Sequence, residues 1–586
     1  MRVLLLHPED LPGVGPWSKQ RWDLIVDLGN SSPFSAETWS RQLGCPVVRA
    51  ASFPDEVADA RCVREIFSAG RGQLIDEEGI DWWDLTSLLL MEEAMTLLAF
   101  RRLAAEISPS GELWSTRSLA DGPAGLFAIV VDKDIHTFGQ QGLTRSAARI
   151  LRYAGLARRF SFAQMKEIFL DKYDPEYGWR SRFARRLRNG VDPVVLVPSA
   201  YTNVSRMAAA YARLLPQQSF LMVTTRQSGR QFAPPPNVQL RDLAAYAKAD
   251  PSRAEAASLL DRWANLRNDL SAIKELQALS RAGALDPIAD WIRDGLPVRN
   301  AWKEVLEREP VCGVLCGDDS NRYTRLPVLL ASKRKIPTVD FHHGAFDGRY
   351  LVKNLPCDAY MAKNEMERDY LLRLCRLPPE KVVIGAPPPE YVAQSNDGQR
   401  TRRTSAVLFS EPYEVAGMRA GEVYRELLPP LCQLVRENGR RLIIKLHPFE
   451  SYSQRGRIVR EVLEPDDREI VSVVEGPPTP EIMAQAWFGI TVESTTAMDC
   501  LRNGVHCFLC GWLTLLPFGY AQQYARFGVG EVLQNVAQIR SIPNRLADFE
   551  KRPAMQWKLS PTADPVMLRS WLTSGLREPA GVRPAL

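Results

Sequence analysis

Short runs of consecutive apolar residues alternate with longer segments of helical periodicity along most of the chain. Amphipathic stretches such as Arg206–Leu215 and Met418–Glu437 separate these runs. The alternation is typical of βαβ units, and uninterrupted apolar strands are expected where both faces of a parallel sheet are covered. The pattern therefore predicts an α/β fold built on parallel sheets. The strand candidates are Val3–Leu6, Leu24–Val26, Phe127–Val131, Val194–Val197, Phe220–Val223, Val311–Cys316, Thr338–Phe341, Ala359–Ala362, Val382–Ile384, Ala406–Phe409, Leu442–Leu446, Ile470–Val474, Phe488–Val492 and His506–Leu509.

The segment YLVKNLPCDAY, around residues 350–357, separates two sets of βα units that are each large enough for a sheet. We therefore expect an N-terminal domain over 1–354 and a C-terminal domain over 355–586. Residues 1–190 either complete the first domain or form a distinct module, and the strand candidates near the N-terminus favour completion. A tail rich in Pro and Arg is expected after about residue 560.

Composition narrows the class of protein. The 586 residues are 45% hydrophobic, 24% charged and 9% aromatic, which excludes a disordered, collagenous or disulfide-scaffold protein. The 74 Lys and Arg against 69 Asp and Glu leave a net charge of +5, too mild over this length to indicate a nucleic-acid partner. The start, MRVLLLHPEDLPG, does not resemble a signal peptide, and no run of 18 apolar residues predicts a membrane span. A cytoplasmic location follows as an expectation.

The ten cysteines lie mostly in apolar, strand-like runs. Cys507 and Cys510 have CxxC spacing, but no second pair accompanies them, so two buried small hydrophobic residues are the better interpretation. Reduced thiols and no cysteine metal site are expected.

Residues 145–188 hold twelve Lys or Arg against four Asp or Glu. Arg145, Arg149 and Arg152 have helical spacing, with apolar residues available for a second face. This segment is either a solvated helix face or an amphipathic surface that contacts anionic lipid or an anionic acceptor. The second alternative predicts a peripheral contact with the inner membrane.

Candidate phosphate-binding residues follow two strands of the second half. His447 and Pro448 come directly after Leu442–Leu446, where a parallel strand delivers its carboxyl end to the ligand-binding edge. Glu493, Ser494, Thr495 and Thr496 come after Phe488–Val492 and before a predicted helix that ends at Gly504. An imidazole N–H together with hydroxyls at a helix N-terminus can bind an anion, although a simple N-cap remains the alternative.

Candidate catalytic residues follow two strands of the first half. Gly317, Asp318 and Asp319 end one strand, and His342 and His343 end the next. Adjacent strand ends would bring carboxylates and imidazoles to one edge, where they could act as base or nucleophile. The alternative for Asp318 is a turn or cap residue. A metal site on these four residues ranks lower, because a phosphate site of His and helix N–H groups needs no cation, and we predict no metal.

Familiar motifs of other enzyme classes do not occur. The chain has no GxxxxGK[ST] loop, no GxGxxG after its first strand and no GxSxG elbow. These absences disfavour a P-loop NTPase, an ordinary dinucleotide dehydrogenase and a serine hydrolase.

The HP pair in KLHP and the later strand–ESTT–helix resemble bacterial glycosyltransferases of the GT-B type. The likeness is greatest to the Kdo transferases and polysialyltransferases of capsule and lipopolysaccharide assembly, which use CMP-sugars; CDP-glycerol glycerophosphotransferases share the style of the second domain. It covers roughly residues 310–515. It implies a GT-B fold, in which two Rossmann-like parallel-sheet domains face a cleft.

The resemblance also implies roles. His447, Ser494 and Thr495, with Thr496, would hold the nucleotide phosphate in a C-terminal donor domain. Asp318 or Asp319, in an N-terminal acceptor domain, would be base or nucleophile, and HHG at 342–344 would contact donor carboxylate or acceptor. The polysialyltransferases place Gly after an acidic pair, whereas Gly317 precedes it here.

The expected activity is metal-independent transfer of a CMP-activated ulosonic acid, Kdo in preference to sialic acid, to a surface glycan or glycolipid. The CMP-sugar is a substrate, and no cofactor is expected. A UDP-sugar, GDP-sugar or CDP-alditol donor is the first alternative. The second is a non-catalytic binding protein of polysaccharide assembly.

Overall fold

The computed structural model of the chain describes most of its residues. The described ranges are 1–7, 10, 13–28, 36–49, 56–107, 111–117, 123–138, 192–226, 232–247, 253–344, 346, 348–388, 403–413, 420–447, 450–476, 479–513, 521–551 and 562–574. The basic segment 145–188 and Pro448 lie outside them.

The strands form three sheets, and every pair of neighbouring strands is parallel. The five-stranded sheet has the order β3-β2-β1-β4-β5, the seven-stranded sheet β12-β11-β10-β9-β6-β7-β8, and the six-stranded sheet β15-β14-β13-β16-β17-β18. The predicted α/β class with Rossmann-like parallel sheets is confirmed. The strands are β1 (Arg2–Leu6), β2 (Leu24–Asp27), β3 (Val47–Arg49), β4 (Glu112–Ser115), β5 (Ile135–Thr137), β6 (Val194–Ser199), β7 (Ser219–Thr224), β8 (Val238–Asp242), β9 (Val311–Cys316), β10 (Thr338–Asp340), β11 (Ala359–Ala362), β12 (Val382–Ile384), β13 (Ser405–Phe409), β14 (Arg441–Lys445), β15 (Val471–Val474), β16 (Ala486–Thr491), β17 (Cys507–Cys510) and β18 (Glu531–Leu533).

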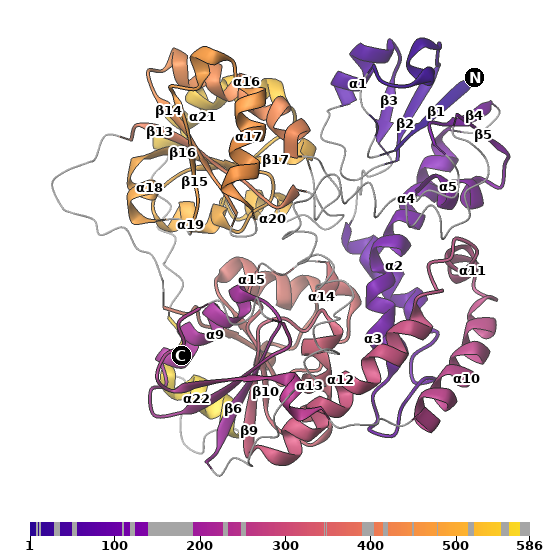
Figure 1. The fold of residues 1–586 in the computed structure, drawn as a ribbon, viewed down its shortest axis with the longest axis vertical. Helices are drawn as coiled ribbons and strands as arrows, with labels where there is room; N and C mark the ends of the chain where they lie inside the picture. The colour runs from indigo at the N-terminus through magenta and orange to yellow at the C-terminus, as the bar shows by residue number, and fades with distance from the viewer. Residues whose placement is uncertain are drawn as a thin grey trace. The chain divides into compact units, whose positions relative to one another are not determined.

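Helices connect the strands and cover the sheets (Figure 1). They are α1 (Ala36–Leu43), α2 (Glu56–Ser68), α3 (Trp82–Ser87), α4 (Met91–Ile107), α5 (Pro123–Val131), α9 (Thr202–Arg213), α10 (Arg253–Leu270), α11 (Lys274–Arg281), α12 (Ile288–Arg308), α13 (Arg322–Lys333), α14 (Arg349–Val352), α15 (Glu365–Asp369), α16 (Ala420–Glu437), α17 (Tyr452–Val462), α18 (Pro480–Gln485), α19 (Thr496–Arg502), α20 (Ala521–Arg526), α21 (Ile542–Lys551) and α22 (Pro565–Ser574).

One strand candidate is wrong. Phe127–Val131 lies in the helix α5 (Pro123–Val131), which begins at a proline. An apolar run of this length does not distinguish a buried strand from a buried helix, and Pro at the first helical position favours the helix. The other thirteen candidates overlap strands of the structure.

The first sheet differs from the favoured expectation. β1 and β2 do not join the strands of residues 194–384, since β1 pairs with β2 and β4 in a sheet of its own. Its core contains Leu4, Leu6, Trp17 and Trp39. Residues 1–137 therefore supply a third parallel sheet.

The predicted boundary at 354/355 lies inside the seven-stranded sheet. β11 and β12 follow it in the chain, yet β11 pairs with β10 and β12 pairs with β11. The chain divides into two compact units, one made of Met1–Glu56, Met95–Arg158 and Tyr391–Trp557, the other of Val57–Ala94, Arg159–Glu390 and Lys558–Leu586. The chain therefore passes from the second unit to the first between residues 390 and 391, after β12, because the strand pairing of the seven-stranded sheet extends through β12. Whether domains face a cleft stays a prediction.

The end of the chain is more than a tail. The helix α22 (Pro565–Ser574) lies beside the seven-stranded sheet, and Figure 1 shows it in yellow next to the magenta strands. Leu568 and Leu572 are fully buried there. A Cβ at Gly313 on β9 would collide with the Leu572 carbonyl, so glycine at this position permits the close approach.

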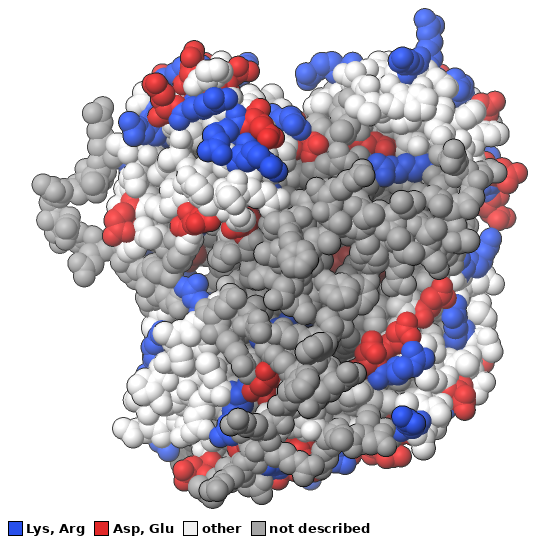
Figure 2. Space-filling model, viewed as in Figure 1, with Lys and Arg blue, Asp and Glu red and all other residues white. Residues whose placement is uncertain are grey.

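The surface shown in Figure 2 mixes both signs of charge. Over the described part of that face, Lys and Arg are interspersed with Asp and Glu, in keeping with the nearly balanced totals of 74 and 69. Among the described residues, no helix combines the length and the apolar character that crossing a membrane requires.

Candidate functional site

The six-stranded sheet brings the predicted phosphate-binding residues to one edge. His447 follows β14 and Glu493–Thr496 follow β16, and β13 lies between these two strands. After β13 the chain continues to β14 and β15 on one side, and after β16 to β17 and β18 on the other. The carboxyl ends of β13 and β16 therefore flank the topological switch point, where ligands bind in sheets of this kind.

Glu450 ties the end of β14 to the end of β13. Its Oε2 accepts a hydrogen bond from the backbone N–H of His447 at 2.8 Å. Its Oε1 accepts from Ser410 Oγ, directly after β13, at 3.0 Å and from Arg455 Nε at 2.7 Å. This buried carboxylate therefore fixes the backbone that carries His447.

Glu411 ties the end of β13 to the end of β16. Its Oε1 accepts from Thr491 Oγ1 at 2.6 Å and from the backbone N–H groups of Val492 and Glu493 at 2.9 Å each. Burial raises the pKa of Glu411, and these donors oppose that rise. The buried side chain of Glu411 thus fixes the backbone of residues 491–493, which lead to Ser494.

The hydroxyl residues lie where the sequence predicts. The helix α19 begins at Thr496 and ends at Arg502, and Gly504 follows with φ +63°. Ser494 Oγ accepts from the Thr496 N–H at 3.3 Å, while Thr495, the N-cap, makes no capping bond with its side chain. Thr496 Oγ1 is buried and has no hydrogen-bond partner among the described residues. Glu493 is buried at this same strand end.

The side chain of His447 is half-buried. Burial, with a smaller contribution from Lys445, lowers the pKa of His447 to about 4. The imidazole is therefore neutral at physiological pH and can bind a phosphate through a ring N–H rather than through charge. Pro448 lies outside the described residues.

The seven-stranded sheet also places its candidates at a switch point. β9 and β10 are neighbours, and β9 pairs on its other side with β6. Asp318 and Asp319 follow β9, and His342 and His343 follow β10. The predicted meeting of carboxylates and imidazoles at adjacent strand ends is thus present in the chain trace.

Asp318 supports a turn. Its Oδ1 accepts from the Ser320 N–H at 2.9 Å and its Oδ2 from Asn321 Nδ2 at 2.8 Å. Asn321 in turn caps α13 by accepting from the N–H groups of Tyr323 and Thr324. Asp318 therefore holds the start of α13, as the turn-or-cap alternative for this residue expects.

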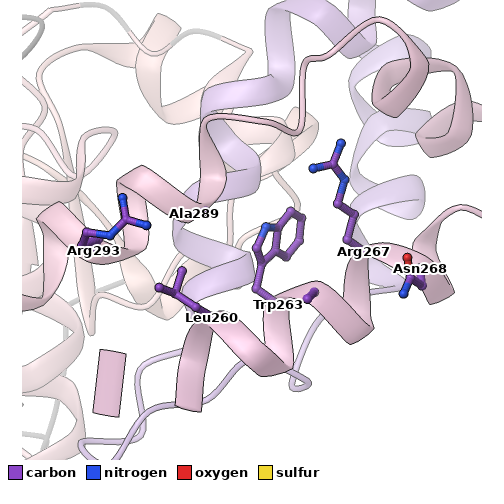
Figure 3. Close-up of a pocket in the computed structure, with 7 residues that line it drawn as sticks. Leu260, Trp263, Arg267, Asn268, Ala289 and Arg293 are labelled. Atoms are coloured by element: carbon purple, nitrogen blue, oxygen red, sulfur yellow. The ribbon is translucent and has the colours of Figure 1, made fainter. Parts of the chain in front are cut away.

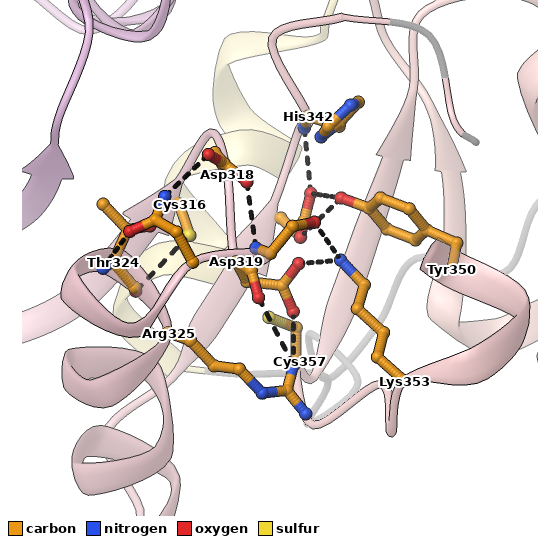
Figure 4. Close-up of polar contacts among 12 residues, drawn as sticks. Cys316, Asp318, Asp319, Thr324, Arg325, His342, Tyr350, Lys353 and Cys357 are labelled. Atoms are coloured by element: carbon orange, nitrogen blue, oxygen red, sulfur yellow. Dashed lines mark hydrogen bonds and ion pairs between the residues drawn. The ribbon is translucent and has the colours of Figure 1, made fainter. Parts of the chain in front are cut away.

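Asp319 points into the protein rather than to the edge (Figure 4). It is fully buried, its Oδ2 accepts from Arg325 at 3.1 Å, and Lys353 Nζ donates to its Oδ1. Although burial opposes ionisation, Lys353 and Arg325 outweigh it and lower the pKa of Asp319. Asp319 thus belongs to a buried ion pair with two cations, and its role as base or nucleophile stays a prediction.

Asp340, which the sequence reasoning missed, lies beside this ion pair. Burial, then the charge of Asp319, raises the pKa of Asp340 to about 8. The Tyr350 hydroxyl donates to its two oxygens at 3.1 and 3.2 Å, and the His342 N–H donates at 2.8 Å. The sequence does contain a signal for this residue, because Asp340 is a charged residue inside the predicted strand Thr338–Phe341.

His342 is enclosed. It has φ +28°, its ring lies 5.1 Å from that of Tyr350 and 5.5 Å from that of Phe346, and its Nδ1 has no partner among the described residues. Burial first, then the nearby His343, lowers the pKa of His342 well below its usual range. A buried, neutral ring fits support of the edge better than contact with substrate.

His343 is half-buried, and a contact with Gly317 fixes the orientation of its ring. The ring Nδ1 of His343 lies 3.0 Å from the carbonyl oxygen of Gly317, and the backbone N–H of His343 donates to the same oxygen at 2.7 Å. Because a carbonyl only accepts, Nδ1 is the nitrogen that donates to Gly317, which leaves Nε2 as the other ring nitrogen. A Cβ at Gly317 would collide with Phe341, which explains glycine before the acidic pair.

A separate pocket of about 530 Å³ lies between α10 and α12 (Figure 3). It contains none of the predicted site residues. Trp263, one of its lining residues, stacks on Trp83 with ring centres 6.0 Å apart, and Arg267 forms an ion pair with Asp286 at 2.7 Å. The pocket lies away from the strand ends, and we assign it no role. Its lining residues are Leu260, Trp263, Ala264, Arg267, Asn268, Ala289 and Arg293.

Comparison with known proteins gives partial structural likeness. No protein-family model matches the chain, and no curated protein matches it. The UDP-GlcNAc 2-epimerase of Methanocaldococcus jannaschii is 11% identical with a TM-score of 0.41, over 64% of this chain and 99% of that chain. The calicheamicin glycosyltransferase CalG4 is 12% identical with a TM-score of 0.36, over 66% and 95%. A glycosyltransferase of Rickettsia africae is 9% identical with a TM-score of 0.36, over 66% and 94%. At these values the likenesses assign no activity to this chain.

Proposed function

We propose that the protein is a nucleotide-sugar glycosyltransferase whose donor is a CMP-activated ulosonic acid, Kdo in preference to sialic acid. The acceptor is an anionic surface glycan or glycolipid of capsule or lipopolysaccharide type. We assign binding of the donor phosphate to the six-stranded sheet.

The observation that best supports this proposal is a pair of buried carboxylates, Glu411 and Glu450, at the switch point between β13 and β16. Glu450 holds His447, and Glu411, next to Ser410, holds the segment before Ser494. The backbone segments that follow β14 and β16 are thus both held by hydrogen bonds to residues at the end of β13. Rigid donors at a switch point are what binding of a phosphate requires.

The donor groups suit a phosphodiester. A neutral His447 offers a ring N–H, and Ser494 and Thr495 add hydroxyls. The buried Thr496 Oγ1 has no protein partner among the described residues, and it would donate a hydrogen bond to a phosphate oxygen. These groups would stabilise the charge that develops on CMP as it leaves.

The transfer itself is one displacement. The acceptor oxygen bonds to the anomeric carbon as the bond from that carbon to the phosphate oxygen breaks. The electron pair leaves with CMP, and the acceptor proton passes to a base. His343 Nε2 fits this role best, since Nδ1 is bound to Gly317, while Asp318 serves the turn. A single displacement inverts the configuration of the anomeric carbon.

The proposal is tested by isothermal titration of the full chain with CMP, CDP, UDP and GDP, with and without EDTA. We expect CMP to bind best, EDTA to change nothing, and His447→Ala to weaken CMP binding at least about 100-fold, the loss of roughly 3 kcal/mol. His136→Ala, on the five-stranded sheet, is the matched control.

Preference for UDP, GDP or CDP would replace the donor class. Binding of CMP to His447→Ala with unchanged affinity would overturn the phosphate site. A His343→Ala variant that binds CMP but transfers no sugar separates catalysis from donor binding, and normal transfer by it would exclude His343 as the base.

A further inference from the structure

The carboxyl edge of the seven-stranded sheet carries a second polar cluster that the sequence reasoning did not find. Four neighbouring strands, in the spatial order β10-β9-β6-β7, are followed by His343, Asp318, Tyr201 and Arg226. The switch point of this sheet lies between β9 and β6. Tyr201 and Arg226 therefore flank it on the side opposite His343.

Aromatic rings orient the guanidinium of Arg226. Its Cζ lies 5.1 Å from the ring centre of Tyr201 and 5.5 Å from that of Tyr323. Arg226 is only 7% exposed, although it lies at the end of a strand rather than in the core. Packing against two tyrosines holds the planar fork in one orientation and leaves less side-chain entropy to be lost on binding.

The ring of Tyr201 also reaches His343. The two ring centres are 6.4 Å apart, and both side chains are half-buried, whereas Arg226 and Tyr323 are buried. A half-buried tyrosine thus lies beside both a half-buried imidazole and a buried cation. Apolar faces of sugar rings pack on aromatic side chains, and a guanidinium binds carboxylates through two parallel N–H bonds.

We infer that Tyr201 and Arg226 form a subsite for an acidic sugar, with Arg226 binding the sugar carboxylate beside His343. The inference rests on the proposed function and adds the group that recognises the charge of the sugar. Because a guanidinium has five N–H donors, Arg226 can bind a carboxylate while it keeps its contacts within the protein.

The test measures binding of monosaccharides to the full chain by ligand-observed NMR titration. The probes are Kdo and its methyl ester, in which a methyl group replaces the negative charge of the carboxylate. Glucuronic acid and glucose 1-phosphate accompany them. We expect Kdo to bind about tenfold tighter than its ester, the value of one charge-assisted hydrogen-bonded pair. Arg226→Gln should lower the affinity for Kdo to that of the ester.

Controls separate this subsite from loss of fold and from the phosphate site. Arg213→Gln, an exposed arginine at the end of α9, should bind Kdo like the wild type. Arg226→Gln should retain CMP affinity, which depends on His447. Arg226→Lys keeps the charge without the fork, and it should prefer Kdo to the ester by a smaller factor. If Arg226→Gln unfolds, the Arg226→Lys variant still tests the subsite, because an unchanged preference for Kdo over the ester would show that the guanidinium is not needed.

The outcomes are distinct. Equal binding of Kdo and its ester to the wild type, or unchanged Kdo binding to a folded Arg226→Gln, overturns the subsite. Binding of glucose 1-phosphate without binding of any carboxylate overturns it as well. Arg226-dependent binding of Kdo supports an ulosonic acid, and binding of glucuronic acid to the same degree supports an acidic glycan. Failure of CMP binding alone would overturn the donor assignment and leave this subsite standing.

Discussion

At the scale of single residues, burial separates side chains that the sequence presents as equals. Asp318 and Asp319 are adjacent, yet the first holds a turn near the edge and the second is enclosed by Lys353 and Arg325. His342 and His343 differ in the same way, since only His343 is partly exposed. The buried member of each pair, the ion-paired Asp319 and the neutral His342, supports the structure.

The low pKa of His447 predicts how phosphate binding depends on pH. With a pKa of about 4, the imidazole stays neutral between pH 5.5 and 8, so its charge does not change over this range. We expect the methyl phosphodiester of CMP, whose charge is constant in this range, to bind with equal affinity at pH 5.5 and pH 8. Isothermal titration at several pH values measures this. Affinity that rises steeply below pH 6.5 would instead indicate a charged imidazole.

The raised pKa of Asp340 predicts a contribution to stability. With a pKa of about 8, the folded state keeps a proton that the unfolded state releases near pH 4. This contribution is complete below pH 4 and is lost as the pH rises to 8. We expect Asp340→Asn to lose less stability than the wild type between pH 5 and 8, as urea unfolding at each pH would reveal. Parallel pH profiles of the two proteins would contradict the assignment.

At the scale of elements, the connection from β16 to α19 depends on one side chain. Removing Glu411 in Glu411→Ala leaves a buried hydroxyl and two N–H groups without their common acceptor. We expect a loss of about 2–4 kcal/mol in the free energy of unfolding and weaker CMP binding. Chemical denaturation and titration measure the two effects.

Matched variants separate the role of this carboxylate from a general effect of substitution. Glu411→Gln keeps an acceptor oxygen and should recover most of the stability and of the CMP affinity. Glu437→Ala, an exposed residue at the end of α16, should change neither. A folded Glu411→Ala with wild-type CMP affinity would show that the connection needs no such anchor.

At the scale of the whole molecule, residues 57–94 belong with the seven-stranded sheet although they lie among the residues of the first sheet in sequence. Asp84 accepts from Arg325 at 3.1 Å, and Asp76 accepts from Arg299 at 2.7 Å. These carboxylates neutralise guanidinium groups that are buried in that unit.

A chain shortened to residues 192–586 should therefore aggregate or fail to fold, because buried cations would lose partners worth about 3–5 kcal/mol each. Expression and gel filtration measure this. In the full chain, Asp76→Asn should be strongly destabilising, whereas Asp290→Asn, in an exposed pair with Arg293, should cost under about 1 kcal/mol. A stable, monodisperse shortened chain would contradict the assignment of residues 57–94.

The sequence by itself determined the features that depend on local order. Strand ends such as Leu442–His447 and Phe488–Thr496 were predictable, because apolar runs and the polar residues that follow them are adjacent in the chain. The α/β class followed from the same alternation. The run Phe127–Val131 marks the limit, since its local pattern fits a helix equally well.

Only the tertiary structure decided what depends on distant partners. That β13 lies between β14 and β16, and that β1 forms a separate sheet, follows from strand pairing across many residues. The burial of Asp319 depends on Arg325 and Lys353, and the orientation of Arg226 depends on Tyr201 and Tyr323. Such contacts leave no periodic signal in the chain, because burial is a property of the packed fold and not of the neighbouring residues.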